Sequence, residues 1–349
     1  MFKQMTEDQV TDVHFKYDKD SGLKSIIAIH NTSRGPALGG CRIIPYSSID
    51  SAIADVLRLA KGMSYKAALA GLDLGGGKAV ILEPAHEYNR EKTFKAFGRF
   101  TEELNGRYIT AMDSGATTND MDNIATQSSY VTCTSSDGNP APYTAKGVFL
   151  GIQACLKACP DFNEHLSGMR VAVQGLGNVG YALCELLHTE GVKLFVSDLD
   201  KNKVNKCVEK FSATGVATDQ IHKTECDIFS PCGLGGILNE QSITELRCRA
   251  VAGSANNQLL TPKCGELLLQ EDILYAPDYL INAGGLIFAA MTYQGFSINK
   301  LNSHLDGIHH TLLNIFRKEQ QIKESGSVIA DRMAENILFG NKHTELASA

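Results

Sequence analysis

The sequence lacks the long apolar run that a membrane-spanning helix requires. No stretch of its 349 residues approaches about 20 consecutive apolar residues. The opening residues, MFKQMTEDQVTDVHF, also lack the charged segment and long apolar segment of a secretory signal peptide. We therefore expect a cytoplasmic protein.

A strongly basic segment is missing too. The formal net charge is -6, and no tail or long run is rich in lysine and arginine. Nucleic acid or an anionic membrane surface is therefore not expected as a main partner.

The sequence has little that resembles a metal site. Its ten cysteines are scattered from Cys41 to Cys264 without a CxxC pair, which favours reduced cytosolic thiols over zinc ligands or disulfides. His309 and His310 are adjacent, so on a helix they would point about 100° apart and share one ion poorly. We expect no metal.

The composition does support folded cores. Hydrophobic residues make up 43% and charged residues 21%, which argues against disorder, and 349 residues predict two domains. The polar segment from Ser135 to Pro142 is the expected linker. We predict a first domain over residues 1–135, joined by a C-terminal helix at about 326–349, and a second over 140–325.

The first predicted domain mixes strands and helices. Lys24–His30 is typical of a strand, and Arg34–Arg42, rich in Gly and Pro, predicts a turn. Apolar positions from Ile53 to Met63 recur at helical spacing, with Ser48 or Asp50 as a cap. Further predictions are a glycine turn leading into a short buried strand over 71–84, a helix over 90–104 and a strand over 107–111.

In the second predicted domain, short strands alternate with helices. The strand segments are RVAVQG, VKLFVSD, DIFSPC and RAVAGSA, with helices from about Lys146, Asn178 and Asn202. This alternation is typical of a doubly wound parallel sheet. Helices are predicted from INAGG to Glu324 and over Val328–Leu338.

A glycine motif follows the first strand of that alternation and opens a helix. It consists of Gly175, Leu176, Gly177, Asn178, Val179 and Gly180. In this context GxGxxG favours a dinucleotide: the first glycine permits the turn, the second admits a pyrophosphate and the third packs helix on strand. The alternative is an ordinary glycine turn between strand and helix.

Asp198 ends the second strand, 23 residues beyond Gly175. A carboxylate there can accept hydrogen bonds from ribose hydroxyls and would repel a 2′-phosphate, which favours NAD over NADP. Lys201 and Lys203 would soften that preference. Alternatively, Asp198 is only a helix cap.

Two lysines, Lys66 and Lys78, are flanked by small and apolar residues. Most lysines are solvated, but these surroundings predict a dry cleft, which would require carboxylates nearby and suit general-base chemistry. Three glycines before Lys78 would let a ligand approach the backbone.

Seven segments together resemble one family. GPALGGCR, LAKGMSYKAALAGLDLGGGKAVI, AMDSGATTNDMD, GNPAPYTAKGV, VAVQGLGNVG, VAGSANNQL and INAGG, in this order from about Asp12 to Ala334, resemble the glutamate/leucine/phenylalanine/valine dehydrogenase superfamily. The resemblance implies an α/β protein with an N-terminal substrate and oligomerisation domain, a Rossmann-type NAD-binding domain, and a cleft between them. It also implies a homo-oligomer, an octamer or a dimer.

The resemblance implies residue roles as well. Lys66 would bind the α-carboxylate of an amino acid, Lys78 would be the catalytic lysine that assists water attack, and Asp113 would shuttle protons and protonate the departing nitrogen. Thr144 would lie beside the nicotinamide, and Asn256 and Asn257 would contact cofactor and substrate. The side-chain pocket would be lined by Leu38, Gly39, Ala111, Leu286 and Ala289.

These pocket residues are apolar or small, which disfavours glutamate because its buried carboxylate would need a partner. The implied reaction is NAD-dependent deamination of a branched-chain L-amino acid, leucine first, to the 2-oxo acid and ammonia. Met112, Ser114 and Phe288 depart from the family pattern and make the substrate less certain. The rivals are an aromatic amino-acid dehydrogenase and a non-catalytic NAD-binding regulator.

Overall fold

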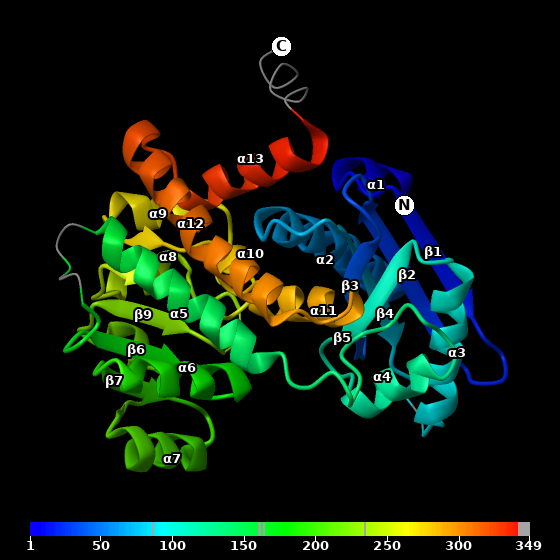
Figure 1. Cartoon of the computed structure of the whole chain (residues 1–349), viewed down its shortest axis with the longest axis horizontal. Helices are drawn as coiled ribbons and strands as arrows, with labels where there is room; N and C mark the ends of the chain where they lie inside the picture. The colour runs from blue at the N-terminus through cyan, green and yellow to red at the C-terminus, as the bar shows by residue number, and fades with distance from the viewer. Residues whose placement is uncertain (86, 160–161, 163–164, 234, 341–349) are drawn as a thin grey trace. The chain divides into compact units, whose positions relative to one another are not determined.

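The computed structural model of the protein describes residues 1–340 except 86, 160–161, 163–164 and 234 (Figure 1). The chain divides into two units. Unit 1 comprises Met1–Asn139, Leu286–Ile298 and the described part of Ala334–Ala349, whereas unit 2 comprises Pro140–Gly285 and Asn299–Met333.

Two segments differ from the predicted domains. Residues 286–298 belong to unit 1, where Thr132 Oγ1 donates to the backbone oxygen of Ala289 at 3.2 Å and lies 2.7 Å from Thr292 Oγ1. The C-terminal helix α13 (Gly326–Phe339) belongs to unit 2 as far as Met333, where Tyr279 donates to Asp331 at 2.7 Å. The predicted helical residues 341–349 lie outside the described residues.

Unit 1 is built on a five-stranded sheet with the order β1-β2-β4-β3-β5. Strand β2 pairs antiparallel with β1 and β4, and β3 runs parallel to both β4 and β5. The strands are β1 (Asp12–Tyr17), β2 (Lys24–Asn31), β3 (Ala37–Ile44), β4 (Gly75–Leu82) and β5 (Tyr108–Met112).

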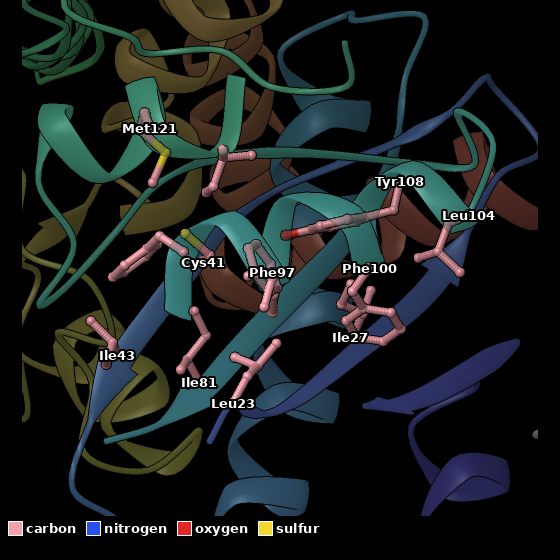
Figure 2. Packing of buried hydrophobic residues seen from close by; sticks show 14 of the residues in the cluster. Leu23, Ile27, Cys41, Ile43, Ile81, Phe97, Phe100, Leu104, Tyr108 and Met121 are labelled. Carbon is pink, nitrogen blue, oxygen red and sulfur yellow. The ribbon is translucent and has the colours of Figure 1, made fainter. Parts of the chain in front are cut away.

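Helices cover both faces of this sheet because alternate strand residues are apolar on each side. Helix α2 (Ile49–Leu69), capped by Ser48, buries Val56 and Leu57 against Ala28 and Val80. Helix α3 (Arg90–Glu103) packs its phenylalanines on the other face, in the cluster around Tyr108 (Figure 2). The other helices with residues in unit 1 include α1 (Phe2–Glu7), α4 (Thr118–Ala125) and α11 (Gly284–Tyr293).

Two sequence-based predictions in unit 1 are wrong. The predicted turn at Arg34–Arg42 contains most of strand β3, and Gly75–Gly77 form the first part of the central strand β4 rather than a turn. The reason is packing: a Cβ on Gly39 would lie 1.7 Å from the carbonyl oxygen of Gly77. These glycines allow neighbouring backbones to approach closely instead of reversing the chain.

Unit 2 contains a six-stranded sheet with the order β11-β10-β9-β6-β7-β8, and its neighbouring strands are parallel. Counted from β6, this is the strand order of dinucleotide-binding folds, whose order reverses between β6 and β9. The strands are β6 (Arg170–Gln174), β7 (Lys193–Ser197), β8 (Thr214–Gly215), β9 (Ile228–Pro231), β10 (Ala250–Val251) and β11 (Leu274–Tyr275).

The helices of unit 2 follow the strands in alternation. They include α5 (Ala141–Ala158), α6 (Asn178–Thr189), α7 (Lys201–Phe211), η1 (Ile221–Lys223), α8 (Glu240–Glu245), α9 (Lys263–Gln270), α10 (Asp278–Ile281) and α12 (Ile298–Ile322). The helical stretch predicted after INAGG is divided into α11 and α12 by a break that contains Gly295 at φ +86°. None of the helices in the described ranges is long and apolar enough to cross a membrane.

Candidate active site

Several predicted catalytic and substrate-binding residues lie on one face of the unit 1 sheet. Directly paired strand residues share a face, and the register pairs Gly40 with Ala111 and Lys78 with Ala28. By this alternation Lys78, Leu38, Gly40, Arg42 and Ala111 lie on the face that α2 covers. Leu38 on β3, the neighbour of the lysine strand β4, and Ala111 on β5 are both buried.

Lys78 and Asp113 form an ion pair on this face, in which the side chain of Asp113 is 23% exposed. Lys78 Nζ lies 2.5 Å from Asp113 Oδ2, and the side chain of Lys78 is 6% exposed. Lys78 extends from the middle of β4, and Asp113 is the first residue after β5. An unpaired ammonium so deeply buried would be costly, so each group depends on the other.

Arg42 is a second cation on the same carboxylate, and sequence reasoning did not identify it. Its Nε donates to Asp113 Oδ2 at 3.3 Å, and its Nη1 donates to Asp55 Oδ2 at 2.9 Å. The signal was present in GPALGGCR: if this segment is read as a strand, alternation places Arg42 beside Gly40.

The surroundings of Asp113 determine its charge. Burial alone would raise the pKa of this carboxyl, but the Lys78 ammonium and then the Arg42 guanidinium outweigh burial and lower the pKa to about 2. Asp113 is therefore an anion at neutral pH. That Asp113 protonates the departing nitrogen stays a prediction, and Lys78, whose Nζ lies 2.5 Å from Asp113 Oδ2, is a second candidate for that role.

Gly39 and Gly40 have different tasks. A Cβ on Gly40 would lie 2.6 Å from the Cβ of Asp113, so this glycine makes room for the carboxylate. Gly39 lies against Gly77, and its carbonyl accepts a hydrogen bond from Tyr108 at 2.6 Å. The structure thus gives Gly39 a packing role, while contact with a substrate side chain stays a prediction.

Lys66 lies half-buried in the last turn of α2. This end of the helix contacts β4 closely: a Cβ on Gly76 would lie 2.0 Å from the backbone nitrogen of Ser64. Gly76 thus lets the helix approach the strand two residues before Lys78. That Lys66 and Lys78 bind one substrate stays a prediction.

Leu286 and Ala289 on α11 are buried and belong to unit 1, as do Leu38 and Ala111. Phe288 is also buried, with its ring centroid 6.4 Å from that of Phe296. Of the other two departures from the family pattern, Met112 is half-buried and Ser114 is exposed. A single pocket formed by these walls stays a prediction.

In unit 2 the glycine motif forms the turn between β6 and α6. Gly175 has φ +94°, and a Cβ there would lie 2.7 Å from Gly233, which follows β9. A Cβ on Gly180 would lie 2.0 Å from the carbonyl oxygen of Gly175, so this glycine permits close packing of helix on turn. Gly177 and Asn178 are exposed.

Asp198 follows β7, and its carboxylate accepts a hydrogen bond from the backbone of this turn. Its Oδ2 accepts from the backbone N–H of Leu176 at 2.7 Å, and its Oδ1 accepts from Asp200 at 2.8 Å. Burial would raise the pKa of Asp198, but these two N–H groups and Lys203 lower it. The alternative that Asp198 caps the next helix is wrong, because Asp200 caps α7.

The remaining predicted cofactor contacts lie in the same unit. Thr144 is half-buried in the first turn of α5, and a Cβ on Gly285 would lie 2.8 Å from its Oγ1. Asn256 and Asn257 are exposed after β10, and Asn256 Oδ1 accepts from Asn282 at 2.8 Å.

These residues fit a dinucleotide. A Cβ on Gly177 would meet no atom within 4 Å, so the space in front of the α6 N-terminus is open. That terminus has no side-chain cap, which leaves its N–H groups for a pyrophosphate. The ionised Asp198 at the end of the neighbouring strand suits ribose hydroxyls.

Comparison with known proteins matches both units. Residues 7–130 match the family model "Glu/Leu/Phe/Val dehydrogenase, dimerisation domain", and residues 196–330 match "Glutamate/Leucine/Phenylalanine/Valine dehydrogenase". The chain is 48% identical to leucine dehydrogenase of Geobacillus stearothermophilus over 339 residues, which cover 96% of this chain and 92% of that protein.

Two further matches extend this likeness. Leucine dehydrogenase of Thermoactinomyces intermedius is 48% identical over 322 residues, 91% of this chain and 88% of that protein. The crystal structure of L-tryptophan dehydrogenase from Nostoc punctiforme superposes with a TM-score of 0.86 at 42% identity, over 97% of this chain and 98% of that one.

Proposed function

Because this chain belongs to the glutamate/leucine/phenylalanine/valine dehydrogenase family, we propose that it catalyses the reversible, NAD-dependent oxidative deamination of a branched-chain L-amino acid. Leucine is the preferred substrate, with valine and isoleucine accepted, and the products are the 2-oxo acid and ammonia. The observation that carries the proposal is the Lys78–Asp113 ion pair on the same sheet face as apolar Leu38 and Ala111. A protein that only binds NAD has no need of such a pair.

The chain's own residues supply binding and proton transfer. Lys66 binds the α-carboxylate, and the anionic Asp113 accepts a hydrogen bond from the amino group of the substrate. Lys78 holds a proton at Nζ, which it can give to the departing nitrogen or regain from an attacking water. When bound at the glycine turn, NAD supplies the chemistry of accepting a hydride.

The residues proposed to line the pocket determine which substrate side chain it accepts. Leu38, Ala111, Leu286 and Ala289 offer no partner charge, so an aliphatic side chain is favoured over that of glutamate. An aromatic amino acid is the second candidate for two reasons. The chain resembles tryptophan dehydrogenase, and the small side chain of Ala289 would leave room for a larger substrate side chain. One methylene changes such discrimination by only about 1–3 kcal/mol, so a range of aliphatic substrates is expected.

The test is NADH formation at alkaline pH with a panel of L-amino acids, each with NAD and with NADP. Leucine with NAD should give the highest kcat/KM. A higher value with phenylalanine or tryptophan would replace leucine by an aromatic substrate. If no amino acid is oxidised while NADH binding is measurable, the protein is instead a non-catalytic NAD-binding regulator.

We also propose a cytoplasmic homo-oligomer, an octamer or a dimer. A match to a dimerisation domain over residues 7–130 supports assembly through unit 1, and ten free cysteines suit a reducing compartment. Light scattering of the purified protein measures the size of the oligomer.

A further inference from the structure

Arg42 lies between two carboxylates of unit 1. Its Nε donates to Asp113 from one edge of the guanidinium, and its Nη1 donates to Asp55 from the other. The Arg42 side chain is 19% exposed and that of Asp55 is 16% exposed. Because the guanidinium is planar and rigid, its orientation toward Asp55 fixes where Nε points.

Asp55 is itself held on both oxygens. Tyr46 donates to Oδ2 at 2.8 Å, and Arg58 donates to Oδ1 at 2.8 Å. Hydrogen bonding to Tyr46 and the charge of Arg42 lower the pKa of Asp55 against the effect of burial. Asp55 is therefore a fixed anion on α2 that anchors Arg42.

We propose that Arg42, anchored by Asp55, is a positioning residue that keeps Asp113 anionic and in place when Lys78 loses its proton. This inference rests on the proposed function, in which Lys78 changes protonation during turnover. Without Arg42, a neutral Lys78 would leave Asp113 buried with no cation, and Asp113 would take up the proton itself. A guanidinium stays protonated at every working pH, so it can hold the carboxylate ionised throughout.

The other groups around Asp113 do not supply this charge. Among the described residues, the cations in contact with Asp113 are Lys78 from β4 and Arg42 from β3. Cys41 and Tyr108 in the same sheet are buried, which raises the pKa of the Cys41 thiol to about 12 and that of the Tyr108 phenol well above its usual value. Both stay neutral, and Asp55 on α2 contacts Arg42.

The direct test is a titration that requires no substrate. Asp113 is followed by carboxyl ¹³C NMR in full-length Lys78→Gln and in Lys78→Gln/Arg42→Gln, with the resonance assigned by Asp113→Asn. In Lys78→Gln the pKa of Asp113 should stay below its ordinary value. In the double variant burial should raise that pKa above the ordinary value. Equal pKa values in the two proteins would overturn the inference.

The second test separates positioning from general stability. Arg42→Gln should lower kcat/KM by on the order of 100-fold, because the carboxylate is displaced, and Arg42→Lys should recover part of that loss by restoring the charge. Arg58→Gln is the matched control, because Arg58 binds the same Asp55 from an exposed position and should change kcat/KM little. If the wild-type protein oxidises no amino acid, the proposed function fails. The NMR titration would still test whether Arg42 keeps Asp113 ionised.

If Arg42→Gln does not fold, Arg42→Lys and Asp55→Asn take its place in both tests. Asp55→Asn removes the anchor and leaves Arg42 present, so it should raise the pKa of Asp113 in the Lys78→Gln background. A folded Asp55→Asn protein with wild-type kcat/KM and an unchanged pKa of Asp113 would refute the anchoring role.

Discussion

A Cβ atom on Gly40 would lie 2.6 Å from the Cβ of Asp113. Real Cβ atoms do not approach so closely, so Gly40→Ala must displace Asp113 from Lys78 and Arg42. We expect kcat/KM to fall by on the order of 100-fold, since displacement of a reacting group by about 1 Å has effects of this size.

Gly62→Ala is the control for that variant. Gly62 lies within α2, and a Cβ there would meet no atom within 4 Å. Alanine should therefore raise helix stability by about 1 kcal/mol and leave kcat/KM unchanged. A Gly40→Ala protein that folds and matches Gly62→Ala in activity would contradict the close contact.

Lys78→Ala should lower turnover by roughly 100- to 10,000-fold, the range for loss of a general acid or base. NADH binding should persist, because the glycine turn and Asp198 belong to unit 2. Steady-state kinetics and NADH fluorescence titration measure the two effects separately. An active Lys78→Ala protein would remove this lysine from the mechanism.

The sequence was a good guide to the cofactor turn and a poor one to the sheet of unit 1. Both interpretations of GxGxxG after a strand, a cofactor turn and an ordinary glycine turn, place its glycines between strand and helix, and the glycines lie there. The glycines of β3 and β4 were interpreted as turns because a local pattern does not show which distant backbone lies against them. The contact between Arg42 and Asp113 was missed for the same reason: it depends on the pairing of β3 with β5.

Asp198→Ala should weaken NAD binding, because the N–H groups of Leu176 and Asp200 lose their acceptor. The variant also removes the carboxylate proposed to accept from the ribose hydroxyls, and one such bond to a charged group contributes about 1.5–3 kcal/mol, so the KM for NAD should rise by tenfold or more. Discrimination against NADP should fall, because a negative charge is removed. Asp200→Asn keeps a capping side chain on α7 and should change the KM for NAD little.

Stability should depend on pH through Glu319. This side chain is 6% exposed, and burial raises its pKa to about 7, although the N–H of Gly326 and Lys323 oppose the shift. A raised carboxyl pKa means that the fold favours the protonated form. The stabilisation is therefore complete below the ordinary pKa and is lost as the pH rises toward 7.

Glu319→Gln removes that titration. The pKa rises from the ordinary 4.5 to about 7, so at about 1.4 kcal/mol per pKa unit the variant should gain on the order of 3 kcal/mol over wild type between acidic pH and pH 8. Denaturant unfolding at several pH values measures the difference. The exposed Glu271→Gln should follow the wild-type curve, and parallel curves for Glu319→Gln and wild type would refute the assignment.

The glycine-lined contacts of β3 and β4 have a consequence for protein engineering. Added atoms at Gly39, Gly40 or Gly76 would collide with neighbouring main chain or with Asp113, so these three positions should not accept a larger residue. Under the proposed function, substitutions that retarget the enzyme to bulkier or slimmer amino acids should be confined to Ala111, Leu286 and Ala289, the residues proposed to line the pocket. Substrate range and proton-transfer chemistry can then diversify independently on one scaffold.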